Sequence, residues 1–146
     1  MNISYIGFMA SGKSTLAKKA AIESGRQLVN IDKEIEYDHS MSISEIFDKF
    51  GEGYFRDKER EKLKEVFKSD NQIIDCGGGA AIFNPDLIKD NSYVIFVDTE
   101  FEVIWERLKD DNTRPVIWNK TKEQLKELYD NRLKIYKRIA NERVSN

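Results

Sequence analysis

A glycine-rich stretch near the N-terminus constrains this chain more than any other feature. Residues 7–14 read G-F-M-A-S-G-K-S, which fits the phosphate-loop pattern G-x-x-x-x-G-K-[S/T]. A strand-like apolar run precedes the stretch and a helical apolar pattern follows it. In that context the glycines let backbone N–H groups surround phosphates, and the helix presents its N-terminus to the same anion. An ordinary glycine-containing turn is the alternative interpretation. The strand-then-helix context favours binding of a nucleoside triphosphate.

The same stretch predicts how the triphosphate and a magnesium ion would be held. Lys13 would supply a mobile positive charge, and the hydroxyl of Ser14 would join the Mg²⁺ shell. We therefore predict ATP and Mg²⁺ as cofactors. The nucleotide-binding residues predicted in and beside the loop are Gly7, Ala10, Ser11, Gly12, Lys13, Ser14 and Thr15.

Composition narrows the class of protein further. The 146 residues are enough for one domain, with 40% hydrophobic and 34% charged residues and a net charge of −2. Because no basic block is present, we expect no binding to nucleic acid. The longest apolar runs are strand-sized, which predicts no membrane span. A strand directly after Met1 leaves no room for a signal peptide, and a single cysteine suits a reducing compartment, so we expect a cytoplasmic protein and a monomer.

The apolar periodicity alternates between strand and helix, which is typical of an α/β protein with a parallel sheet. The polar stretch 110–120 contains Arg114 and lies between two helical patterns, so it is a candidate lid. The predicted strands are 2–6, 27–31, 72–76 and 93–97, and the predicted helices are 13–24, 33–38, 43–50, 53–68, 101–109 and 121–142.

Two arginines fall on helix faces that the apolar pattern predicts to be buried. Arg132 lies on the apolar stripe of the last helix, and Arg56 lies three residues before the inward-facing Glu59. Arg132 either reaches the surface or a core carboxylate, or points into a cleft and holds an anionic substrate. Arg56 and Glu59 either form a salt bridge on a solvated flank or belong to the same site.

Polar and glycine residues follow two predicted strands, where open α/β sheets bind ligands. Asn30 and Asp32 close the second strand, and Asp75 ends the third, just before the glycine triplet 77–79. Three glycines directly after a strand allow a ligand or another backbone to approach very closely. A flexible linker is the alternative.

Several motifs in order now resemble one known family over residues 3 to about 140. They are the phosphate loop; Asp32-Lys33-Glu34-Ile35-Glu36; Ile43 with Ile46-Phe47; Gly51-Glu52 with Phe55-Arg56 and Glu59; Gly77-Gly78-Gly79; Arg107 before Arg114-Pro115; and Arg132 with Tyr136. Together they resemble shikimate kinase, a small-molecule kinase of aromatic amino-acid biosynthesis. The resemblance implies a three-layer P-loop NTPase fold of the nucleoside-monophosphate-kinase type, in one kinase domain over residues 1–146, with a helical substrate-binding region at 32–68 and the lid at 110–120.

The resemblance also implies a reaction, the transfer of the ATP γ-phosphoryl group to the 3-hydroxyl of shikimate. Asp32 would bind the substrate hydroxyls and act as base, and Lys13 and Arg114 would stabilise charge on the phosphoryl group. Arg107 would lie near the adenine. The substrate-binding residues implied are Asp32, Phe47, Phe55, Arg56, Glu59, Gly77, Gly78, Gly79 and Arg132. A planar guanidinium pair suits a carboxylate, which resolves the ambiguity at Arg56 and Arg132 in favour of a clamp.

The sequence departs from the family pattern at the metal site. The family usually has an acid at position 30, where this chain has Asn30. Asp75 follows an apolar strand as a metal-binding aspartate would, so we predict that Asp75 supplies the charge that Asn30 lacks, with Asn30 contacting a metal-bound water. Asp75 as a strand-end turn residue is the alternative.

The second departure is at the C-terminus. Family members continue with a fifth strand, an adenine-contacting loop and a final helix, whereas this sequence stops at residues 144–146, barely into the expected strand. The prediction is therefore that the C-terminal strand and helix are missing, either by truncation or in a natural short form.

Two other functions compete with shikimate phosphorylation. A related kinase of another small alcohol, such as gluconate, would keep the phosphate loop, but Arg56, Arg132 and the glycine triplet favour shikimate. A non-catalytic relative that binds nucleotide or shikimate would not need Asp32, Lys13 and Arg114.

Overall fold

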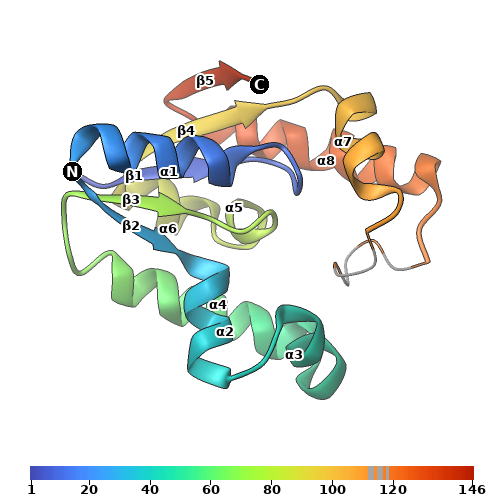
Figure 1. Ribbon diagram of the computed structural model, residues 1–146, viewed down its shortest axis with the longest axis horizontal. Helices are drawn as coiled ribbons and strands as arrows, with labels where there is room; N and C mark the ends of the chain where they lie inside the picture. Colours follow the sequence, from blue (N-terminus) through green and yellow to red (C-terminus); the bar gives the residue numbers. More distant parts are fainter. Residues whose placement is uncertain (112–113, 115–116, 118) are drawn as a thin grey trace.

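Five short strands form one parallel sheet in the computed structural model, which describes residues 1–111, 114, 117 and 119–146. Their order across the sheet is β2-β3-β1-β4-β5, and every neighbouring pair is parallel (Figure 1). The strands are β1 (Ile3–Ile6), β2 (Gln27–Asn30), β3 (Gln72–Asp75), β4 (Tyr93–Asp98) and β5 (Glu142–Ser145). All strands therefore end at the same edge of the sheet.

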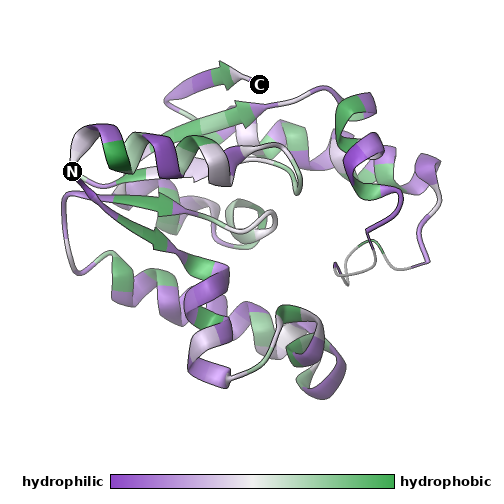
Figure 2. Ribbon diagram, viewed as in Figure 1, coloured by the Kyte–Doolittle hydropathy of each residue, from purple (hydrophilic) through white to green (hydrophobic). Residues whose placement is uncertain are grey.

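Helices cover both faces of this sheet, which gives the three layers that the sequence predicted. One face packs against α1 through Ala17 and Ala21, and the other carries the larger core, into which α4, α6, α7 and α8 place apolar side chains. Figure 2 shows the apolar colouring concentrated on β3 and β4. The helices are α1 (Lys13–Ser24), α2 (Ile31–His39), α3 (Ile43–Phe50), α4 (Glu52–Val66), α5 (Ala80–Phe83), α6 (Pro85–Asn91), α7 (Phe101–Leu108) and α8 (Lys122–Ile139).

The boundary between β2 and α2 differs from the prediction. Helix α2 begins at Ile31 rather than at residue 33, because the side chain of Asn30 accepts a hydrogen bond from the backbone N–H of Lys33 (3.0 Å) and caps the helix. Asp32 consequently lies in the first turn of a helix rather than at the end of a strand.

The C-terminal part of the chain also differs from the prediction. Helix α8 ends at Ile139, and residues 142–145 pair with β4, so the expectation that the C-terminal strand is missing is wrong. Asn141 starts this pairing, because its backbone N–H donates to Val94 O and its side chain accepts from Val94 N, both at 2.8 Å. This strand is short and most of its residues are charged or polar, so it carries little apolar periodicity.

Two short helices, α5 and α6, were not predicted. They follow the glycine triplet and meet at Asn84, with Pro85 in the first turn of α6. Proline at that position is a helix-start signal that sequence reasoning had available.

The helices at the carboxyl edge of the sheet stand apart from one another. Figure 1 shows α2 and α3 on one side of this edge and α7 on the other. The predicted lid, 110–120, lies between α7 and α8, and its residues 112–113, 115–116 and 118 fall outside the described residues. The lid therefore stays a prediction. None of the helices described is both long and apolar enough to cross a bilayer.

Candidate active site

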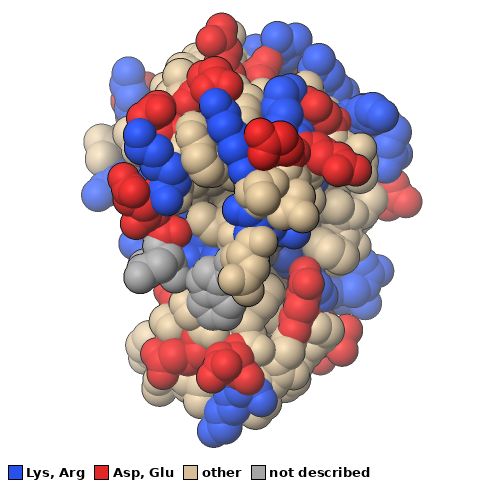
Figure 3. Space-filling model, turned by 90° about the vertical axis from the view of Figure 1, so that its right-hand side faces the viewer, with Lys and Arg blue, Asp and Glu red and all other residues tan. Residues whose placement is uncertain are grey.

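A cleft of about 930 Å³ opens at the carboxyl edge of the sheet. Figure 3 looks onto this side of the molecule and shows Lys and Arg side chains near the middle of the face. The predicted site residues that line the cleft are Ala10, Ser11, Gly12, Lys13, Ser14, Thr15, Asn30, Asp32, Phe47, Phe55, Arg56, Glu59, Asp75, Gly77, Gly78, Gly79, Arg107, Arg114 and Arg132.

The phosphate loop runs from β1 into α1. Its Lys13 side chain is buried, at 7% exposure, and its ammonium group donates to the carbonyl of Phe8 at 3.5 Å. Burial lowers the pKa of Lys13, while the nearby carboxylates of Asp75 and Asp32 oppose this shift. The side chain of Ser14 is exposed to the cleft. The loop therefore holds one desolvated cation beside an exposed hydroxyl.

Three side chains from distant parts of the chain hold this loop in place. Thr99 Oγ1 and Asn146 Nδ2 each donate to the carbonyl of Ser11 at 2.7 Å, and Arg107 Nη1 donates to the carbonyl of Ala10 at 2.6 Å. These bonds fix the carbonyls of Ala10 and Ser11 and tie the loop to segments that are distant in the sequence.

Gly7 is the one predicted site residue outside the cleft lining. A Cβ atom at this position would lie 2.8 Å from the carbonyl oxygen of Val97 and 2.9 Å from Ser11 Oγ, which is too close for any side chain. Gly7 lets the loop lie against the end of β4.

Asp32 faces the glycine triplet from the first turn of α2. A Cβ atom at Gly77 would lie only 2.6 Å from Asp32 Oδ1, and this buried oxygen has no hydrogen-bond partner among the described residues. Burial raises the pKa of the Asp32 carboxyl and Asp75 adds to the shift, whereas Lys13 opposes it. A buried carboxylate oxygen without a partner is costly, and it is poised to accept a proton or a hydroxyl hydrogen bond from a ligand.

Asn30 and Asp75 lie side by side at the ends of β2 and β3. Asn30 Nδ2 donates to Asp75 Oδ2 at 3.1 Å, and Asp75 is only 4% exposed. The amide oxygen of Asn30 already accepts the capping bond from Lys33. The amide therefore presents its N–H₂ group to Asp75, and the negative charge of the pair belongs to Asp75 alone.

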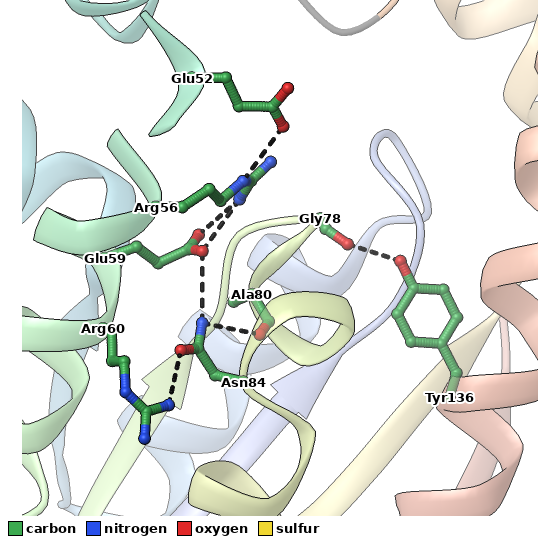
Figure 4. Close-up of polar contacts among 8 residues, drawn as sticks. All are labelled: Glu52, Arg56, Glu59, Arg60, Gly78, Ala80, Asn84 and Tyr136. Atoms are coloured by element: carbon green, nitrogen blue, oxygen red, sulfur yellow. Dashed lines mark hydrogen bonds and ion pairs between the residues drawn. The ribbon is translucent and has the colours of Figure 1, made fainter. Parts of the chain in front are cut away.

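Arg56 and Glu59 form a buried ion pair on α4 (Figure 4). Arg56 Nη1 donates to both carboxylate oxygens of Glu59, at 2.9 and 3.0 Å, while Arg56 Nε donates to Glu52 at 3.3 Å. Glu59 is 0% exposed, and burial raises its pKa to about 7, although Arg56 opposes that shift. The solvated-flank interpretation of this pair is therefore wrong, because Glu59 is buried and both residues line the cleft.

The faces of the Arg56 guanidinium are also covered. The guanidinium carbon lies 4.2 Å from the centroid of the Phe83 ring and 5.2 Å from that of the Phe55 ring. Phe55 in turn packs on Phe47, with 5.1 Å between their ring centroids. A Cβ atom at Gly79 would lie 2.6 Å from Arg56 Nη2. The absence of a side chain there leaves room for the guanidinium beside the glycine triplet.

Arg132 reaches the same cleft from α8 and is 6% exposed. Burial lowers the pKa of Arg132, and the positive charge of Arg56 lowers it further, while Tyr136 opposes the shift. Tyr136 is buried against Phe96, and its hydroxyl donates to Gly78 O at 2.6 Å. Two arginines that repel each other in one cleft are suited to an anionic ligand.

Two further arginines were predicted for the site, and both belong to its phosphate-loop side. Arg107 is exposed and bonded to the loop, and Arg114 Nε lies 3.2 Å from Asp111 Oδ2. Among the described residues, no three His, Cys, Asp or Glu side chains gather as a metal cluster. Mg²⁺ commonly takes only one or two carboxylates together with phosphate oxygens, so Asp75 and Ser14 fit such an ion.

The chain matches one family of known proteins. A family model described as shikimate kinase matches residues 9–146. The chain belongs to the shikimate kinase family. Its resemblance to this family, predicted from the motifs, is confirmed.

Individual members of the shikimate kinase family support this assignment. The shikimate kinase of Persephonella marina is 40% identical over 137 residues, which cover 92% of this chain and 83% of that protein. The shikimate kinase of Staphylococcus aureus is 40% identical over 139 residues, which cover 92% and 78%.

Solved structures of the family confirm the predicted fold. The shikimate kinase of Acinetobacter baumannii in complex with shikimate superposes with a TM-score of 0.93 at 29% identity, covering 99% of this chain and 83% of that one. The Aquifex aeolicus shikimate kinase gives a TM-score of 0.87 at 36% identity, with 99% and 86% coverage.

Several residues of this shikimate kinase site were missed by sequence reasoning. Thr99 and Asn146 hold the phosphate loop, Phe83 covers Arg56, and Asn84 contacts Glu59. Thr99 lies just after the predicted strand 93–97, and a polar residue at that place was a usable signal. The other three carried none, because each acts through a contact between segments far apart in the sequence.

Proposed function

We propose that this chain transfers the γ-phosphoryl group of ATP to the 3-hydroxyl of shikimate. The observation that carries the proposal is the meeting of three groups in one cleft: the phosphate loop, the unpartnered oxygen of Asp32, and the arginine pair of Arg56 and the buried Arg132. Family membership supports the kinase activity, and the Acinetobacter baumannii family member was solved in complex with shikimate.

The phosphate-loop end would hold the nucleotide. The loop N–H groups and Lys13 would bind its phosphates, with Ser11, Gly12 and Thr15 at the start of α1, where a helix N-terminus favours an anion. When bound, ATP with Mg²⁺ supplies the phosphoryl group and neutralises part of its charge. Ser14 and Asp75 would hold the ion, and Asn30 would orient Asp75 through their hydrogen bond.

The arginine end would hold the substrate carboxylate. Arg56 and Arg132 come from different helices and present guanidinium groups to the same space beside the glycine triplet. A guanidinium binds a carboxylate through two parallel hydrogen bonds, which fixes the orientation of the substrate as well as its position. Phe47 and Phe55 would cover the apolar face of the ring.

Asp32 would connect the two ends. Its Oδ1 oxygen would accept the hydrogen bond of the attacking hydroxyl and then its proton, and its pKa, raised by burial, makes it a better base than a solvated aspartate. Since the transition state of phosphoryl transfer is loose, alignment and charge contribute more than covalent chemistry. Lys13 and Arg114 would stabilise charge on the transferring group, and Arg107 would lie near the base of the nucleotide.

The decisive experiment is coupled ADP release with purified protein. We expect release that depends on Mg²⁺ and on shikimate, with little release without an acceptor or with gluconate. Release with gluconate alone would favour the related alcohol kinase, and binding of both ligands without ADP release would favour a non-catalytic relative. We also expect a monomer, which size-exclusion chromatography with light scattering would test.

A further inference from the structure

Asn84 is a buried polar residue that the proposed reaction does not use. It joins α5 to α6 directly after the glycine triplet and is 2% exposed. Its Nδ2 atom donates to Ala80 O at 3.1 Å and to Glu59 Oε1 at 3.4 Å, and its Oδ1 atom accepts from Arg60 Nη1 at 3.3 Å (Figure 4). Asn84 thus connects the ion pair at the cleft with an exposed arginine on the outer flank of α4.

The chemistry of the neighbours fixes the orientation of this amide. A carboxylate and a carbonyl, which only accept, lie on one side, and a guanidinium, which only donates, lies on the other. A flipped amide would place oxygen against oxygen and N–H₂ against Arg60. Every polar atom of the Asn84 side chain therefore has a suitable partner in one orientation only.

We propose that Asn84 is a positioning residue for the substrate carboxylate, because it holds Glu59 in the orientation in which Glu59 fixes Arg56. Arg60 completes the arrangement by holding the amide from the solvent side. This proposal rests on the proposed function, and it extends the substrate site to two residues that lie outside the cleft lining.

The geometry of Arg56 explains why the support matters. Arg56 donates both of its hydrogen bonds to Glu59 from the single atom Nη1, whereas Nη2 lies beside the glycine triplet without a hydrogen bond to any described residue. A rotation of the Glu59 carboxylate would therefore move the Nη1 end of the guanidinium. Asn84 opposes that rotation by binding Oε1, and the adjacent Phe83 lies against the guanidinium from the same segment.

Electrostatics supports the same role. Besides its burial and the ion pair with Arg56, Glu59 faces Asp32 from α2, which raises its pKa, and Arg132 from α8, which lowers it. An N–H donor favours the ionised carboxyl, so loss of Asn84 should raise the pKa of Glu59. The neutral carboxyl would then predominate at higher pH and hold Arg56 less firmly.

The test compares Asn84→Ala, Asn84→Asp and the control Asn91→Ala, which removes an exposed asparagine at the end of α6 whose side chain bonds Leu87 O. We measure KM for shikimate and for ATP, and kcat, from pH 6 to 9. We expect Asn84→Ala to raise the shikimate KM about three- to tenfold with little change in the ATP KM, since a bond to a charged group is lost. The pH below which shikimate binding weakens should move upward by about half a unit or more.

Asn84→Asp separates positioning from packing, because it keeps the volume and the acceptor for Arg60 but places a second carboxylate beside Glu59. We expect a larger rise in shikimate KM than with Asn84→Ala. An Asp variant with wild-type KM and pH profile would overturn the proposal, and it decides alone if the Ala variant does not fold. Unchanged kinetics of a folded Ala variant, or an equal loss in Asn91→Ala, would also overturn it. A wild-type protein without shikimate-dependent ADP release would instead contradict the proposed function.

Discussion

The two ends of the cleft are built to hold anions in different ways. At the phosphate loop, side chains from distant segments fix the backbone carbonyls of a contiguous motif. At the arginine end, the binding groups are side chains: Arg132 is buried, and Arg56 is held by Glu59, which Asn84 contacts in turn. The first arrangement depends on a local sequence motif, whereas the second depends on contacts among α2, α4, α5 and α8.

This difference has an energetic consequence. The backbone groups of the phosphate loop carry no net charge that must be buried. Lys13 is the one buried cation among the described residues of the loop. The arginine end buries Glu59 and Arg132 and leaves only 12% of the Arg56 side chain exposed, and desolvation of charged groups is costly. We therefore expect the arginine end to be tuned for its ligand at the expense of stability.

Removing the base between the two ends should have the largest effect. We expect Asp32→Asn to lower kcat about 10²- to 10⁴-fold, because the amide cannot accept the proton of the attacking hydroxyl. The affinity for ATP, measured by calorimetry, should change little. Near-normal turnover would show that Asp32 is not the base, and that another group must connect the phosphate-loop end with the arginine end.

A change at the arginine end alone should separate the two anion sites. We expect Arg132→Lys to raise the shikimate KM about 10- to 100-fold, since a point charge cannot replace the two-pronged guanidinium. The ATP KM should stay within about twofold of wild type. Arg138→Lys, in the last turn of the same helix, is the matched control. An unchanged shikimate affinity would contradict the clamp.

Removing the negative charge of Asp75, which we expect to face the metal ion, should affect the phosphate-loop end alone. We expect Asp75→Ala to raise the Mg²⁺ concentration needed for half-maximal activity several-fold, because Asn30 brings no charge of its own. Asp75→Asn, which preserves size, tests the charge separately. If both variants titrate with Mg²⁺ as the wild type does, Asp75 is a structural strand-end residue.

The smallest effect concerns stability rather than catalysis. The folded-state pKa of Glu59 is raised from 4.5 to about 7 by burial, so its neutral form fits the fold better. Its contribution to stability is complete below about pH 4.5 and is lost as the pH rises through about 7. Over this window the unfolding free energy of the wild type should fall, relative to that of Glu59→Gln, by on the order of 2 kcal/mol.

Chemical denaturation of the ligand-free protein at several pH values measures this difference. Glu61→Gln, at an exposed position on the same helix, is the matched control and should show no such window. Parallel curves for wild type and Glu59→Gln would show that burial of Glu59 costs the fold little.

The sequence predicted the phosphate-loop end more completely than the arginine end, for a physical reason. The strand, the loop and α1 are contiguous, so spacing alone brings Lys13 and Ser14 to one place. Arg132 and Arg56 stand out on apolar faces of their helices, but only the family resemblance pairs them. The four strands and six helices expected from periodicity are present; α1 and α3 have the predicted bounds, and the ends of the others are shifted.

What the sequence did not predict depends on tertiary contacts. The sequence predicted that Asn30 and Asp32 end a strand. Asn30 instead caps α2, so Asp32 lies in the first turn of that helix. Strand β5 exists because its backbone pairs with β4, which composition does not signal. Asn84 reads as a turn residue before Pro85, and its contact with Glu59 follows only from how α4 and α5 pack.

The Asp32 carboxylate occupies the space that a side chain at position 77 would need, so only glycine fits beside it. A mutation at this position, which has no reactive group, should therefore mimic loss of the base. A ranking of positions by the reactivity of their side chains would overlook Gly77. A saturation screen in which growth depends on shikimate phosphorylation should find this position as intolerant of substitution as Asp32.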